Sequence, residues 1–97
     1  MCTRYDYYTT MDFKYDPRKS QANKAKHGID FIHAQDLWED PGRVNFIARF
    51  QDEDRFGLVA SHDGHIWCAI YTTRDFRIRI ISVRKARDYE KDIYNQS

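Results

Sequence analysis

The chain has 97 residues, enough for one domain but not for a separate regulatory domain. Its hydrophobic fraction of 41% and charged fraction of 32% are typical of a folded core with a solvated surface, and they exclude a disordered chain. The formal net charge of +1 excludes a bulk polycation that coats nucleic acid. No apolar run reaches the roughly 20 residues of a membrane span, and no signal-peptide pattern opens the chain, so we expect a cytoplasmic protein.

The N-terminal part predicts a tail, a short strand and a helix. Residues 1–10 are polar, rich in tyrosine and without a regular period, so we expect a tail there, ordered or not, and a single domain over residues 11–97. A short strand is expected to open this domain. Asp16 and Pro17 then form a helix start, because the carboxylate accepts free N–H groups and proline suits the first helical position. Gly28 ends this helix in the left-handed conformation.

A second helix is predicted from Asp30, which caps it, to the Asp40-Pro41-Gly42 turn. Its apolar residues fall on one face at helical spacing, and they are Phe31, Ala34, Leu37 and Trp38.

The hydrophobic period then changes to two, which predicts four strands. They are expected near residues 44–50, 56–60, 66–73 and 77–84. Asp63-Gly64 is a hairpin signal between the second and third of them. A closing helix is expected from Lys85, with Ala86, Tyr89 and Ile93 facing inward.

The predicted fold class is therefore α+β: a short N-terminal strand, two helices, a four-stranded antiparallel meander and a C-terminal helix. We expect the helices to pack on one face of the sheet and the other face to be partly open. Cys2 lies in the tail and Cys68 in a strand expected to be buried, so free thiols in a reducing compartment are predicted.

Charge is split along the chain although its sum is small. Seven basic residues fall near the C-terminus, and they are Arg74, Arg77, Arg79, Arg84, Lys85, Arg87 and Lys91. A split of this kind can create a local anion site, and the alternative is a solvated surface with balancing charges.

Several phrases, taken in order, resemble one family. They are Asp16-Pro17-Arg18-Lys19, Asn23, Lys26-His27-Gly28-Ile29, Glu39-Asp40-Pro41, Glu53-Asp54-Arg55-Phe56, Tyr71-Thr72-Thr73-Arg74, and Arg79 to Ala86 with its Arg-Ile-Ile-Ser-x-Arg-x-Ala pattern. Over roughly Phe13 to Tyr94 the chain is similar to the BrnT family of type II toxin–antitoxin systems. The strand over residues 44–50 matches poorly, and Val83 stands where the family usually has alanine.

The resemblance implies a compact fold similar to RelE-type RNases and an RNA-cleaving activity that arrests translation. It implies an RNA substrate and no cofactor. The implied protein partner is a BrnA-like antitoxin that covers the toxin and represses the shared operon, so DNA is contacted only through the antitoxin.

Metal-free RNA cleavage needs a base for the ribose 2′-hydroxyl, positive charge for the phosphorane and an acid for the leaving oxygen. Arg79 is the foremost candidate for the positive charge. In a strand where Ile78 and Ile80 point to one face, Arg79 points to the other, and we expect it to be half-buried. Such an arginine needs an anionic partner, either a substrate phosphate or a carboxylate such as that of Glu90.

Four further residues are candidates for catalysis. Arg55 begins the neighbouring strand, where structural pairing is the alternative. Lys26 and His27 close the first helix, where they are candidate acids or bases, or cations favoured by the helix dipole. Tyr71 is a candidate for proton sharing or a core aromatic residue.

RNA contacts are expected from Arg74, Arg77, Arg84 and Trp67. The alternative for Arg84 is an ion pair with Glu90, and for Trp67 it is core packing. His62 and His65 flank a tight turn with no third ligand nearby, so no metal site is expected. We therefore predict a metal-independent endoribonuclease toxin. Since no clear acid–base pair is visible, a non-catalytic RNA- or antitoxin-binding module is the alternative.

Overall fold

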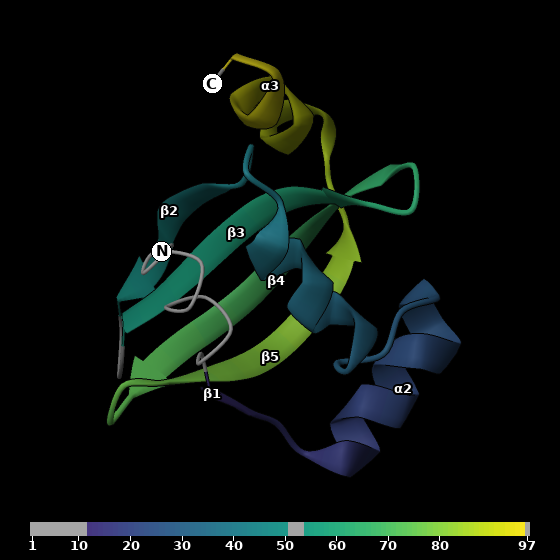
Figure 1. Cartoon of the computed structure of the whole chain (residues 1–97), viewed down its shortest axis with the longest axis vertical. Coiled ribbons are helices and arrows are strands. Elements are labelled where there is room, and N and C mark those ends of the chain that lie inside the picture. Colours follow the sequence, from purple (N-terminus) through teal and green to yellow (C-terminus); the bar gives the residue numbers. More distant parts are fainter. Residues whose placement is uncertain (1–11, 51–53, 97) are drawn as a thin grey trace, which may run out of the picture.

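The computed structural model describes residues 12–50 and 54–96, so the predicted tail over residues 1–10 lies outside the described residues. A five-stranded sheet with the strand order β1-β5-β4-β3-β2 forms the centre of the molecule (Figure 1). Its strands are β1 (Asp12–Lys14), β2 (Val44–Phe50), β3 (Asp54–His62), β4 (His65–Arg74) and β5 (Arg77–Lys85). The helices are α2 (Pro17–His27), the 3-10 helix η1 (His33–Glu39) and α3 (Asp88–Gln96).

The predicted fold layout was wrong in the sheet. We expected a four-stranded antiparallel meander, whereas β1 adds to β5 in parallel and makes the sheet mixed and five-stranded. This pairing joins segments about 65 residues apart, and a local hydrophobic period carries no information on it. The second predicted helix is a 3-10 helix, and the closing helix begins at Asp88 because β5 extends to Lys85.

The helix start and one hairpin turn follow from local chemistry, as predicted. The Asp16 carboxylate accepts a hydrogen bond from the Arg18 N–H at 2.9 Å, and Gly28 ends α2 with a φ of 88°. The turn between β3 and β4 places Asp63 and Gly64 at φ values of 53° and 80°. Both positions lie in the left-handed region, as the favoured two-residue hairpin turn requires.

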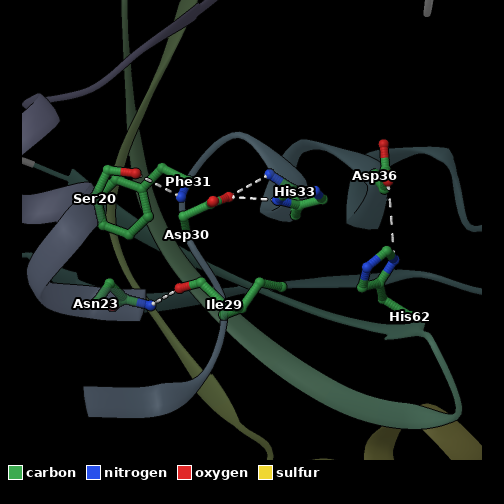
Figure 2. Close-up of polar contacts among 8 residues, drawn as sticks. All are labelled: Ser20, Asn23, Ile29, Asp30, Phe31, His33, Asp36 and His62. Atoms are coloured by element: carbon green, nitrogen blue, oxygen red, sulfur yellow. Dashed lines mark hydrogen bonds and ion pairs between the residues drawn. The ribbon is translucent and has the colours of Figure 1, made fainter. Parts of the chain in front are cut away.

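Asn23 holds α2 along the edge of the sheet. Its amide nitrogen donates to the carbonyl oxygens of Ile29 at 2.8 Å and Val83 at 2.9 Å, and its amide oxygen accepts from the Val83 N–H at 3.2 Å. The Asn23 side chain therefore hydrogen-bonds to the β5 backbone at Val83, which the short strand β1 does not reach. Figure 2 shows the Asn23–Ile29 contact, and beside it the Ser20 hydroxyl, which accepts from the Phe31 N–H at 2.8 Å.

One face of the sheet, called here the core face, packs against η1 and the segment that leads into it (Figure 1). The apolar residues predicted to share one face of the second helix are all buried there, and they are Phe31, Ala34, Leu37 and Trp38. They meet Leu58, Ala60, Ala69, Ile80 and Val83 of the sheet. Apolar burial on this face is the main source of stability.

The opposite face, called here the α3 face, is covered by α3 at one end only. Val59, Cys68 and Ala86 form a small buried cluster there with the partly buried Tyr94. The Tyr94 hydroxyl donates to the Asp40 carboxylate at 2.8 Å, which ties α3 to the turn before β2. The expectation that all helices pack on one face was therefore wrong.

Cys68 is a free, buried thiol, and burial raises its pKa to about 12. None of the helices in residues 12–50 and 54–96 has the length and apolar composition that a membrane span requires.

Candidate nucleic-acid interface

Strand alternation decides which side chains reach the uncovered part of the α3 face. Phe13, Ile78 and Ile80 belong to the core cluster, so Lys14 and Arg79, which lie between or beside them, point to the other face. On β3 the same alternation puts Arg55 on the α3 face, because Phe56 packs against the core.

The strand register brings these basic residues into one line across the sheet. Lys14 pairs with Arg79, and Arg79 pairs with Thr72. Phe56 pairs with Tyr71, so Arg55 lies opposite Thr72. We call Lys14, Arg79 and Arg55 the basic row, with Thr72 between the two arginines. Neighbours in such a line have Cβ atoms about 5 Å apart, so three cationic side chains share one strip of surface.

The basic row is electrostatically uncompensated among the residues that the structure describes. None of Lys14, Arg79 and Arg55 forms an ion pair with a carboxylate in that part of the chain. Lys14 and Arg79 are exposed and Arg55 is half-buried, so the prediction of a half-buried Arg79 was wrong. The exposure follows from α3, which covers the other end of this face. Uncompensated like charges in one strip favour binding of an anion.

Thr72 is only 4% exposed in the middle of the row, and its hydroxyl donates to the Asp54 carbonyl at 2.8 Å. This bond fixes the start of β3 against β4, next to Arg55. It therefore holds the backbone on which the row is built.

An open hollow of about 530 Å³ lies on the same face, between the row and α3. Its lining residues are Phe46, Ile47, Ala48, Arg55, Ile70, Arg84, Tyr89 and Glu90. Arg55 thus belongs to both the row and the hollow. Tyr89, expected to face inward, is 55% exposed and forms part of this wall.

Arg84 forms an ion pair with Glu90, which is the alternative that the sequence left open. Two parallel bonds join the guanidinium to the carboxylate, at 2.7 Å and 2.9 Å, and the Arg87 N–H donates to the same carboxylate at 2.8 Å. The Glu90 side chain is 1% exposed. The pair therefore docks the first turn of α3 onto the sheet.

The pKa of Glu90 reflects this contact. Burial alone would raise the pKa, but the hydrogen bonds from Arg84 and Arg87 and the positive charge of Arg84 outweigh it and lower the pKa to about 2. The bond to Glu90 in turn raises the pKa of Arg84. Both groups are charged at neutral pH. The Glu90 carboxylate therefore balances the positive charge of Arg84 at the edge of the hollow.

Arg74 and Arg77 lie at the end of the same face, where β4 and β5 meet. Both are exposed, and the Arg77 guanidinium pairs with Asp12 at 3.0 Å. The half-exposed state of both partners makes this a weak surface ion pair.

Tyr71 and Trp67 lie on the core face, away from the row. Tyr71 packs edge-on against Trp38, its hydroxyl donates to the Asn45 amide oxygen at 2.7 Å, and burial raises its pKa. Trp67 is buried and donates to the His62 carbonyl at 3.1 Å. Both residues are therefore packed in the core, which is the alternative that the sequence left open for each of them.

Lys26 and His27 lie at the end of α2. Since α2 starts after β1 and passes Val83 at Asn23, its C-terminal end is carried away from Arg79 along β5. Arg79 and Val83 alone are about 13 Å apart along a strand. In the described part of the chain neither Lys26 nor His27 lines the hollow.

Two further histidines, His33 and His62, each contact a single carboxylate, whereas His65 packs edge-on against Trp67. Asp30 accepts from both the backbone N–H and the ring of His33 at 2.8 Å, and His62 lies 4.0 Å from Asp36 (Figure 2). The first of these bonds is the main cause that lowers the pKa of Asp30. Among the described residues no three His, Cys, Asp or Glu side chains are grouped closely enough to hold a metal ion.

Sequence reasoning missed Lys14 and Thr72 as members of the site. Lys14 was not singled out from the sequence, because its neighbour Arg79 is reached through the parallel pairing of β1 with β5. Alternation around Phe13 was the one signal for its direction.

Comparison with known families finds a match for this chain. A family model described as a ribonuclease toxin, BrnT, of type II toxin–antitoxin system matches residues 15–90. The match contains Arg55, Arg79, Arg84 and Glu90 and begins one residue after Lys14. No curated protein matches the chain.

Proposed function

The chain belongs to the BrnT family of ribonuclease toxins of type II toxin–antitoxin systems, and from this premise we propose that it cuts RNA on the basic row without a metal ion. The 2′-hydroxyl of a ribose gives its proton to water and attacks the neighbouring phosphate, the bond from phosphorus to the 5′-oxygen breaks, the 5′-oxygen takes a proton from water, and a 2′,3′-cyclic phosphate remains. Arg79 and Arg55 stabilise the negative charge that develops on the phosphorane.

The single observation that supports this site is the basic row itself. Three cationic side chains from β1, β5 and β3 share one uncovered strip, and none of them pairs with a carboxylate among the described residues. Guanidinium groups can grip a phosphate through two parallel N–H bonds. Charged donors that point at the developing negative charge stabilise the transition state.

The hollow beside Arg55 supports a place for the nucleotide next to the scissile phosphate. Its floor is apolar at Phe46 and Ile70, and Tyr89 stands exposed at its wall. A base can pack on such a surface while its phosphate reaches the row. Arg84 has the role of holding α3 as one wall of the hollow.

The family premise implies an antitoxin as protein partner. We propose that it is BrnA-like, that it covers the toxin until it is degraded, and that released toxin arrests translation. A gene for a small DNA-binding protein next to the toxin gene is expected, and co-expression of the two genes should restore protein synthesis.

The product ends of the reaction test the proposed chemistry. The purified protein is incubated with single-stranded RNA in EDTA, and the fragment ends are mapped. We expect 2′,3′-cyclic phosphate or 3′-phosphate ends and 5′-hydroxyl ends, and we expect Arg79→Ala to cut about 100-fold more slowly while remaining folded. Loss of cutting in EDTA would contradict the metal-free route, and full activity of Arg79→Ala would remove Arg79 from the mechanism.

A second candidate function is a non-catalytic RNA- or antitoxin-binding module. One observation favours it: the only His, Asp or Glu among the described residues that line the hollow is Glu90, which is held by Arg84. This module would bind RNA and leave it intact after long incubation. The end-mapping experiment separates the two functions.

A further inference from the structure

We infer that Phe76, at the tip of the β4–β5 hairpin, is a stacking platform for an unpaired base of the RNA that the basic row binds. The inference rests on the proposed function and adds to it a contact outside the hollow.

The backbone of this turn is unfavourable for phenylalanine. Asp75 and Phe76 have φ values of 54° and 64°, so both central residues are left-handed. The β3–β4 turn has the same geometry, but there the second position is Gly64, which has no side chain to clash. Asp75 tolerates this conformation, whereas a bulky residue in it is an outlier. The strained residue is therefore Phe76.

The Phe76 ring does not contribute to the core. The residue is 101% exposed, so its side chain is fully in water. Among the described residues no aromatic ring packs on it. The hairpin thus carries a residue that is costly for the turn and unused in folding. A strained position of this kind points to a function outside the fold.

The surroundings of Phe76 favour a nucleic acid. Arg74 and Arg77 flank the turn as register partners, on the α3 face that carries the basic row. Arg77 and Arg79 are two residues apart on one strand, which is about 7 Å. Basic side chains that follow the backbone, with an aromatic ring for a base, are the general means by which proteins bind single strands.

The antitoxin is the competing occupant. An exposed ring that anchors a protein partner normally sits in a packed patch of other apolar groups. The residues on either side of Phe76 in the strand pair are arginines and an aspartate instead. Arg77 is paired with Asp12, so the positive charge that favours a polyanion here is that of the neighbouring basic row, which Arg79 joins about 7 Å along β5.

The test compares Phe76→Asn with Phe76→Tyr. Asparagine fits the left-handed position and removes the ring, whereas tyrosine keeps the ring. We expect Phe76→Asn to bind a 2′-O-methyl single-stranded RNA about 5- to 100-fold more weakly than the wild type, with a raised urea midpoint. Phe76→Tyr should stay within about threefold of the wild type. Cleavage should be impaired through KM, with kcat retained.

Ile32→Asn is the matched control, because Ile32 is also exposed, at 59%, but lies between α2 and η1. It should leave RNA affinity unchanged. Equal RNA affinity of Phe76→Asn and wild type would overturn the inference, and so would loss of antitoxin binding with RNA affinity intact. A wild-type protein that neither binds nor cuts RNA would instead refute the proposed function.

Discussion

The two ends of the α3 face carry arginines in opposite electrostatic situations. At the covered end, Arg84 is joined by two bonds to a carboxylate that is 1% exposed. At the uncovered end, Arg79 on the same strand is exposed and has no carboxylate partner among the described residues. The residue type is the same, but the partner differs. One arginine therefore stabilises the docked helix, and the other is available to an external anion.

The largest expected effect concerns the uncovered end. Arg79→Ala and Arg55→Ala should each lower the single-turnover cleavage rate about 100-fold, because each removes a charged donor from the phosphorane. If both contact one phosphate, the double variant should lose less than the product of the single effects, or less than about 10⁴-fold. The free energy of unfolding should change by less than about 1 kcal/mol, since neither breaks a described ion pair.

Arg18→Ala is the matched control for these variants, because Arg18 is an exposed arginine on α2 outside the row. It should cut RNA at the wild-type rate. Fully multiplicative losses in the double variant would mean that Arg55 and Arg79 act on different groups, which would break up the row as one site.

The second prediction concerns the covered end. Glu90→Gln leaves the Arg84 guanidinium without its counter-charge in a largely buried position, so we expect the free energy of unfolding to fall by about 3 kcal/mol. Urea unfolding at neutral pH measures this. Glu39→Gln, at an exposed glutamate of η1, should change it by less than about 0.5 kcal/mol. Equal effects of the two variants would contradict the difference drawn between the two ends.

The third prediction sharpens the same contrast through pH. The folded pKa of Glu90, about 2, lies below its ordinary value of 4.5, so its stabilising contribution is complete above pH 4.5. As the pH falls from 4.5 towards 2, the carboxylate is protonated more readily in the unfolded chain, and stability is lost. The wild type should therefore lose more stability over this interval than Glu90→Gln. Urea titrations of both proteins at several pH values would measure this loss. If both proteins lose the same stability between pH 4.5 and pH 2, the result would argue against the lowered pKa of Glu90.

Local patterns predicted the elements well but not their assembly. Asp16, Pro17 and Gly28 set the limits of α2 through contacts within a few residues, and Asp63-Gly64 formed its turn. The parallel addition of β1 to β5 depends on contacts across the whole chain, which no local period encodes. The docking of α3 on the second face depends on a buried Glu90, and a glutamate in a helix normally indicates the solvated side.

The candidate site was predictable in its residue types but not in their grouping. Arg79 and Arg55 were identified from alternation and from the family phrases, and the register places both in one row. Tyr71 shows the opposite case, because the same alternation points it into the core face, where Trp38 and Asn45 hold it. The sequence distinguishes functional from structural positions in these strands only when the pairing partner of each residue on the next strand is also known.

The smallest expected effect tests whether Lys14 belongs to the row. Each phosphate neutralised by a protein cation contributes about 0.7 to the slope of log affinity against log salt for a single strand. Lys14→Gln should therefore weaken binding of a 2′-O-methyl RNA only a few-fold and reduce the slope by about 0.7. Lys19→Gln, at an exposed lysine of α2, should leave the slope unchanged. If Lys14→Gln also leaves it unchanged, the anion site ends at Arg79, and the parallel strand β1 has only a structural role.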